Sequence, residues 1–204
     1  MHRKKSTRRH ARSTRRAARR FGKFEMLEDR RLLANFVVTN TNDDGGEGSL
    51  RFAIRQANEN PGLDFIDFNI PGSGVHTIRP TRLLPTITDQ VIISGDSQPG
   101  YEPGKPLIEL DGSLAGSAHG LEFRGRGGNW VEGLIIHSFS DIGIVLAEPD
   151  NPSPTGGTTI IGNFIGTDAT GMLAKGNGRA GIHLVRSPNN RFEQNLISGK
   201  HDSG

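Results

Sequence analysis

The chain of 204 residues contains no cysteine, one tryptophan, one tyrosine and no long uninterrupted apolar run. The lack of cysteine excludes a disulfide framework, a thiolate metal site and a cysteine nucleophile. No stretch approaches the roughly 18 consecutive apolar residues of a membrane-spanning helix, so we expect no transmembrane span. Hydrophobic residues make up only 33% of the chain, which argues against a compact helical bundle.

Glycine and proline are abundant instead, with 28 and 11 residues. Many short strands joined by glycine-rich turns fit this composition. Residues 1–31 hold 13 of the 25 lysines and arginines against three acidic residues, a net charge of +10. The remaining residues hold 12 basic and 19 acidic groups, a net charge of −7. The basic character therefore belongs to the tail, and we divide the chain into a tail at 1–34 and a domain at 35–204.

The tail has no apolar periodicity in its first 20 residues, and we expect it to be disordered in isolation. Such a basic segment fits a nucleic-acid-binding arm, a membrane-surface segment or the positive region of an export signal. Its last part reads Leu27, Glu28, Asp29, Arg30, Arg31, Leu32, Leu33, Ala34. This segment resembles the LEPR-type sorting motif of large exported proteins from planctomycete bacteria, with Asp29 in place of the motif's proline. The resemblance implies export, cleavage near Ala34 and a secreted or cell-surface location, and we expect no nucleic acid partner.

The domain begins with a short β-type run at 36–39 and a polar turn region that ends at Gly48. The next apolar residues recur at helical spacing after Ser49, a typical N-cap residue, which predicts an amphipathic helix over 50–59. Gly48-Ser49-Leu50-Arg51-Phe52-Ala53-Ile54 resembles the CSLREA segment that opens many secreted β-helix proteins, with Gly48 in place of its cysteine and Phe52 in place of its glutamate. A helix here would cap the open end of a β-solenoid.

Short β-rich runs follow the helix at 65–70, 75–78, 86–94 and 107–110, and the second half of the chain repeats. Aligning 129–136, 159–165 and 190–197 gives two apolar columns: Val131, Ile160 and Phe192 in one, and Ile136, Ile165 and Ile197 in the other. A Gly-apolar-any-apolar pattern recurs at Gly120, Gly143 and Gly181, with Gly204 as the start of a further copy. Stacked coils that share a continuous core require such columns.

Asn163 and Asn195 occupy matching positions between apolar strand residues. Asparagine tolerates the left-handed backbone conformation and its amide can bond to a stacked copy, so it suits a turn between two sheets. The segment 163–171 resembles segments of bacterial pectin-lyase-like proteins. The fold we predict is all-β: a right-handed parallel β-helix with a short N-terminal capping helix and a disordered basic tail.

The resemblance implies that lyases of this architecture bind calcium through carboxylates, and that its hydrolases use clustered aspartates. Asp64 and Asp67 lie in one predicted strand, but their opposite parity directs them to opposite faces. The one adjacent pair, Asp43 and Asp44, precedes the helix. Asp168 in a projecting loop could bind calcium with neighbouring carbonyls, although a polar turn explains it better. We therefore expect no catalytic residues and no cofactor, with calcium as the one alternative.

The histidines lack the i, i+2 or i+4 spacing of a metal site on one element. Trp130 and Tyr101 are candidates for stacking on sugar rings, although Trp130, beside the core column, also fits a partly buried position. The ligand-binding residues are otherwise undetermined by the sequence.

We expect an exported cell-surface or extracellular module for adhesion or carbohydrate binding, without catalysis, whose partner is an extracellular polysaccharide or a cell-surface component. Two alternatives stay open: a polysaccharide lyase or glycoside hydrolase of the same architecture, and nucleic-acid binding through the basic tail. The chain stops where a repeat would begin at Gly204, so we expect the domain to be incomplete there. An uncapped last coil has unpaired strand edges, which favour self-association.

Overall fold

The computed structural model describes residues 33–125, 127–147 and 157–198. These residues form short β-strands, one α-helix, α1 (Leu50–Glu59), and two 3-10 turns at Gly95–Ser97 and Gly112–Leu114. The expected all-β class is therefore confirmed. Residues 1–32, and with them the sorting motif up to Leu32, lie outside the described part. In that part, no helix is long and apolar enough to span a membrane.

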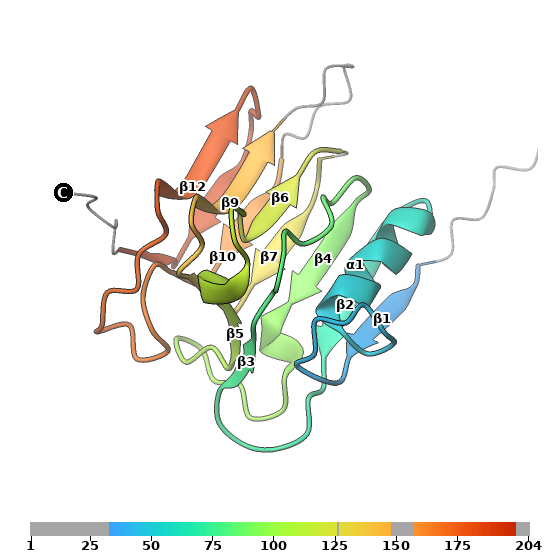
Figure 1. Cartoon of the computed structure of the whole chain (residues 1–204). Coiled ribbons are helices and arrows are strands. Elements are labelled where there is room, and N and C mark those ends of the chain that lie inside the picture. The colour runs from blue at the N-terminus through green and yellow to red at the C-terminus, as the bar shows by residue number, and fades with distance from the viewer. Residues whose placement is uncertain (1–32, 126, 148–156, 199–204) are drawn as a thin grey trace, which may run out of the picture. The chain divides into compact units, whose positions relative to one another are not determined.

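The strands form three sheets, which we call A, B and C (Figure 1). Sheet A contains, in order, β1 (Asn35–Val38), β2 (Asp64–Phe68), β4 (Val91–Ser94), β7 (Trp130–Glu132), β10 (Thr159–Ile161) and β13 (Arg191–Glu193). Sheet B contains β3 (His76–Ile78), β5 (Ile108–Asp111), β8 (Leu134–His137), β11 (Phe164–Ile165) and β14 (Leu196–Ile197). Sheet C contains β6 (Leu121–Phe123), β9 (Ile142–Ala147) and β12 (Ala180–Val185).

The chain passes through the three sheets in a fixed order. From β4 onwards, consecutive strands lie in sheets A, B and C in turn, as far as β13 in sheet A and β14 in sheet B. The neighbouring strands within each sheet are parallel. Parallel neighbours need a crossover connection: helix α1 connects β1 to β2, and from β4 onwards the strands of the other two sheets form the connections.

Helix α1 has the predicted bounds, and Ser49 caps it by accepting a hydrogen bond from the backbone N–H of Phe52. Its apolar face, which includes Leu50 and Ile54, belongs to the same core as the buried side chains of β1 and β2. Arg51 fixes the helix to the rest of the domain, because it donates to Asp43 at 2.8 Å and to the backbone carbonyl of Leu83 at 2.7 Å. The helix therefore covers the apolar core at the sheet A edge strand β1, beside which it lies in Figure 1.

The run that we predicted as one strand at 86–94 is divided between two sheets. Ile87 forms a parallel bridge with Phe123 of β6, whereas Val91–Ser94 is β4 of sheet A. The Asp89 carboxylate accepts hydrogen bonds from the backbone N–H groups of Gly62 and Gln90 at the corner between the two parts. The single-strand prediction was wrong because both parts are apolar and periodicity does not mark the corner. The other three predicted strands are present with slightly different bounds.

Inward-facing side chains form columns across neighbouring strands. The parallel register joins the repeat positions in two columns: Val131, Ile160 and Phe192 in sheet A, and Ile136, Ile165 and Ile197 in sheet B. The first two members of each column are fully buried, while Phe192 is 40% and Ile197 50% exposed. Burial in the core therefore decreases toward β13 and β14, the last strands described.

The repeated glycines mark close backbone contacts beside sheet C. A Cβ atom on Gly120 would lie 2.4 Å from the carbonyl oxygen of Gly143, and one on Gly143 would lie 2.6 Å from that of Gly181. Such distances are far inside van der Waals contact, so only glycine fits at these positions. The pattern that we noted in the sequence thus has a steric cause.

Asn163 and Asn195 stack at the corner between sheets A and B. The Asn163 side chain is fully buried, accepts from the backbone N–H of Leu134 at 2.9 Å and donates to the carbonyl of Val131 at 3.0 Å. The backbone N–H of Asn163 donates in turn to Asn195 Oδ1 at 3.0 Å. We expected the asparagines to have the left-handed backbone conformation, but the residue before each of them has it: Gly162 (φ 64°) and Gln194 (φ 54°). These preceding residues make the turn, so the asparagine amide can bond to the neighbouring strands.

We predict that Asn163→Ala lowers the free energy of unfolding by about 3 kcal/mol, because it leaves buried backbone groups of two strands without partners. Chemical denaturation followed by circular dichroism measures this loss. The matched control is Asn42→Ala. The Asn42 side chain is exposed, so its removal should change the free energy of unfolding by no more than about 0.5 kcal/mol. Equal losses in the two variants would contradict a structural role for the asparagine stack.

Candidate functional site

Trp130 lies on the outer face of sheet A, in register with two other large apolar side chains. The register places Phe65 beside Ile92 and Ile92 beside Trp130. The residue that follows each of them along its strand is fully buried in the core. Because successive side chains of a strand point to opposite faces, these three form a half-buried apolar column on the outer face, which we call the outer column.

Carboxylates lie next to the outer column. The indole Nε1 of Trp130 donates to Glu132 Oε2 at 2.8 Å, and the position of Glu132 corresponds to Asp67 in β2 and to Glu193 in β13. Tyr101 lies close by: burial, and after it the negative charges of Glu132 and Asp96, raise the pKa of its hydroxyl. The outer face of sheet A thus combines apolar rings with hydrogen-bond acceptors and negative charge.

The outer face of sheet B carries a polar cluster around Glu109 of β5 and His137 of β8. His137 Nε2 lies 2.8 Å from Glu109 Oε1, and Thr77 donates to Glu109 Oε2 at 2.6 Å. The ammonium of Lys175 lies 3.4 Å from both Glu109 Oε1 and His137 Nε2. Glu109 is 8% and His137 only 1% exposed, so these two side chains are shielded from water although they face away from the core.

Glu109 is held in its charged form. The hydrogen bond from His137 lowers its pKa to about 2; this outweighs the opposing effect of burial and is reinforced by Thr77 and Lys175. A carboxylate with this pKa is ionised at any pH at which the protein would work. The charge in turn fixes the histidine, since its Nε2 must carry the proton that it donates to the carboxylate.

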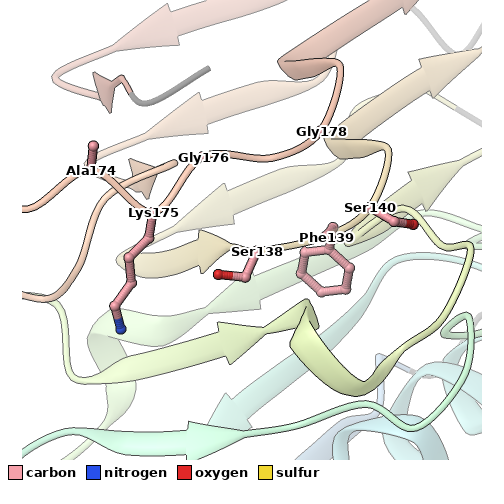
Figure 2. Close-up of a pocket in the computed structure, with 7 residues that line it drawn as sticks. All are labelled: Ser138, Phe139, Ser140, Ala174, Lys175, Gly176 and Gly178. Atoms are coloured by element: carbon pink, nitrogen blue, oxygen red, sulfur yellow. The ribbon is translucent and has the colours of Figure 1, made fainter. Parts of the chain in front are cut away.

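A cavity of about 570 Å³ adjoins this cluster, at the corner between sheets B and C. Figure 2 shows that two chain segments line it, one with Ser138, Phe139 and Ser140, the other with Ala174, Lys175, Gly176 and Gly178. Ser138 follows His137 directly, and its Oγ lies 2.9 Å from His137 Nδ1. The cavity therefore opens beside the polar cluster, with one hydroxyl and one ammonium that belong to both.

A second cavity, of about 300 Å³, shares Ser140 with the first. Its lining includes His119 and Asp141, whose nearest side-chain atoms are 3.4 Å apart. Arg179 lies 3.3 Å from the same carboxylate group. Asp141 thus holds two positively charged or chargeable groups at this corner.

The acidic residues considered in the sequence lie apart. Asp64 is fully buried and accepts from the backbone N–H of Ala34, whereas Asp67 lies on the outer face and accepts from Asn35. Their opposite orientation is as predicted. Asp64 and Asp67 therefore share no site.

Asp168 accepts hydrogen bonds from other residues of its own loop. Its Oδ1 accepts from the Thr170 hydroxyl at 2.8 Å and from the backbone N–H of Leu173 at 3.2 Å. Among the described residues, no group of three or more histidine, aspartate or glutamate side chains could hold a metal ion. The geometry therefore accounts for Asp168 as the acceptor of a polar turn.

Of the sorting motif, the structure describes only Leu33 and Ala34. Leu33 is 65% exposed, and the carbonyl of Ala34 accepts from the backbone N–H of Phe65. Ala34 thus lies directly before β1. The repeat positions from Val131 to Asn195 serve the core and the asparagine stack, and none of them lines either cavity.

We predict that Glu109→Gln weakens the dependence of the unfolding free energy on acid. The folded pKa of about 2 lies below the ordinary glutamate value of 4.5, so the charged group stabilises the native state fully above about pH 5 and loses this effect as the pH falls toward 2. Urea denaturation between pH 2 and pH 7 measures the slope. A wild-type slope retained in the variant would contradict the contribution of this carboxyl.

Neither a scan against protein-family models nor a search of the curated proteins finds a match for this chain. Relatives therefore assign no role to these side chains. Their roles have to be inferred from geometry and chemistry.

Proposed function

We propose that the three sheets are the faces of a right-handed parallel β-helix, and that this chain is an exported module that binds a neutral polysaccharide on the outer face of sheet A. The cyclic order of the strands supports the first part, because a chain that returns to each sheet after visiting the other two describes a coil. Crossover connections between parallel strands are right-handed in about 98% of cases. The asparagine stack and the capping helix agree with this architecture.

The proposal of sugar binding is based on the outer column. Phe65, Ile92 and Trp130 lie on three consecutive parallel strands, which are spaced roughly 4.8 Å apart. Apolar side chains in such a row offer successive contacts to a linear chain that lies across the strands. Trp130 offers a large, flat apolar surface on which a sugar ring can stack, and its N–H is bonded to Glu132.

The charges of this face favour a neutral polysaccharide. Glu132 and Asp67 contribute carboxylates beside the outer column, and Glu193 lies in the same row, paired with Arg191. Carboxylates accept hydrogen bonds from sugar hydroxyls but repel the carboxylates of a uronic-acid polymer. We therefore infer that neutral sugars bind and acidic sugars do not.

The proposal of export is based on the sequence of the basic tail. The segment from Leu27 to Ala34 resembles a planctomycete sorting motif, and cleavage near Ala34 would release a domain that begins at β1 with Asn35. The remaining domain would carry a net charge near −7, unlike the precursor. This acidic domain also disfavours a nucleic-acid partner.

We predict that Trp130→Ala lowers the affinity for a soluble neutral β-glucan about tenfold, or by ~1.4 kcal/mol, because it removes the largest ring of the outer column. Affinity electrophoresis of the full chain in gels that contain the glucan measures the retardation. The matched control is Phe52→Ala, since Phe52 is a half-buried aromatic residue on α1.

Retardation that is the same for wild type and Trp130→Ala would contradict the assignment to this face. Stronger retardation by polygalacturonate than by the glucan would contradict the charge argument. Shortening of the glucan chains would indicate the lyase or hydrolase alternative in place of binding.

We predict that residues 1–40 fused to a reporter are sufficient for export in a planctomycete host and are cleaved near Ala34. Cell fractionation and mass spectrometry of the reporter measure its location and its new N-terminus. Replacement of Arg30 and Arg31 by alanine should retain the reporter in the cytoplasm. An uncleaved cytoplasmic reporter from the wild-type segment would refute the sorting role.

A further inference from the structure

Three side chains beside the larger cavity form a continuous hydrogen-bonded line. Ser138 Oγ lies 2.9 Å from His137 Nδ1, and the other ring nitrogen, Nε2, lies 2.8 Å from Glu109 Oε1. A hydroxyl, an imidazole and a carboxylate in this order are the parts of an activated serine nucleophile. The line joins the cavity surface at Ser138 to the shielded carboxylate at Glu109.

The positions of the protons on Ser138 and His137 follow from the charge of the buried carboxylate, Glu109. Glu109 is charged, and Thr77 donates to its second oxygen, so the histidine must place its proton on Nε2 to donate to Oε1. In the tautomer with the proton on Nε2, the lone pair lies on Nδ1 and is directed at the serine hydroxyl. The hydroxyl donates to that lone pair, which is the arrangement in which the imidazole can remove its proton.

The backbone holds Ser138 in an unusual conformation. Its φ is 58°, in the left-handed region that residues other than glycine rarely adopt. The neighbouring backbone secures it, because Ser138 N–H donates to the carbonyl of Lys175 and Phe139 N–H donates to the buried side chain of Asn177. Strained residues of this kind cluster at functional sites, and nucleophilic serines are commonly presented on such sharp turns.

Lys175 supplies a positive charge to the same cavity. Its ammonium lies 3.4 Å from Glu109 Oε1 and its side chain is 40% exposed. Ser138 and Lys175 project from different segments of the cavity lining (Figure 2). This ammonium therefore places a positive charge beside the carboxylate and the Nε2 side of the imidazole.

We propose that this site hydrolyses carboxylic esters of short acyl groups, with Ser138 as nucleophile, His137 as general base and acid, and Glu109 as the residue that positions the histidine. His137 Nδ1 takes the proton of the Ser138 hydroxyl while Oγ bonds to the ester carbonyl carbon. The bond from that carbon to the alcohol oxygen then breaks, and the alcohol leaves with the proton from Nδ1. Water attacks the acyl-serine by the same steps, releasing the carboxylic acid and restoring the hydroxyl.

The lining indicates a small acyl group. Ala174 and Gly176 carry a methyl group and no side chain, and Gly178 packs so closely that a Cβ atom there would lie 2.1 Å from the carbonyl oxygen of Ser140. The site lies at the corner between sheets B and C, whereas the outer column lies on sheet A. Ester hydrolysis is therefore independent of the glycan binding proposed above, and either can fail without the other.

The test uses the full chain with two probes, p-nitrophenyl acetate and diisopropyl fluorophosphate. We predict hydrolysis of the acetate above the buffer rate and a single phosphoryl adduct on Ser138, located by peptide mass spectrometry. Ser138→Gly should lower the hydrolysis rate about 100-fold or more and abolish the adduct. Glycine is chosen because it accepts a φ of 58° without strain, so the fold is retained.

The matched control is Ser73→Ala. Ser73 is an exposed serine that lines neither cavity. It should keep the wild-type rate and adduct. Absence of the Ser138 adduct in the wild type, or equal rates in wild type and Ser138→Gly, would overturn the proposal.

The positioning role of Glu109 has its own readout. The charged groups that face His137 are Glu109, Lys175 and, at 3.9 Å, Asp111, which also pairs with Arg79. Glu109→Gln removes the acceptor that orients the imidazole, so kcat should fall while KM stays unchanged. An unchanged kcat would show that the carboxylate does not position the histidine.

Discussion

The structure depends on the in-register hydrogen bonding of parallel strands. Each backbone pair, such as Ile160 with Val131 and Phe192, fixes the inward and outward faces of a strand together. A slip by one residue would move every apolar side chain of that strand from the core to the surface. The buried Asn163 amide holds this register at the corner between sheets A and B, and Gly143 and Gly181 allow the close backbone contacts within sheet C.

Sequence patterns located most of the fold because they report this register directly. The repeated apolar and asparagine positions and the helix at 50–59 follow from local spacing. The corner within 86–94 could not be found, because Ile87 and Val91 are both buried and apolar and only a tertiary contact assigns them to different sheets. The left-handed turn residue was missed for a related reason, since Gln194 carries no sequence signal for that conformation.

The polar cluster could not be predicted because its members come from two separate strands and a loop. Glu109, His137 and Lys175 lie 28 and 38 residues apart along the chain, and each alone is an ordinary polar residue. Adjacent strands bring the first two together, and the loop after Gly166 adds the third. One signal was available: Asp111 and His137 lie side by side on neighbouring strands, at equivalent repeat positions. This pairing can be recognised only when the register of the strands is already known.

The two surfaces use opposite aspects of the same scaffold. The outer column needs a row of like side chains, which the repeats supply at equal spacing on sheet A. The cluster beside the cavity needs unlike side chains at one point, which arise where the repeats depart from one another. Regularity thus suits an extended polymer, and irregularity suits a localised reaction.

The decline in burial from β10 to β13 and from β11 to β14 has a consequence for local opening. Backbone amides in the inner strands, beside fully buried Ile160 and Ile165, should exchange with deuterium more slowly than those beside Phe192 and Ile197. Because each strand rests chiefly on its immediate neighbours, the opening of one strand would first weaken the strands beside it. Exchange would then report a graded series of partly opened forms in place of a single cooperative unfolding.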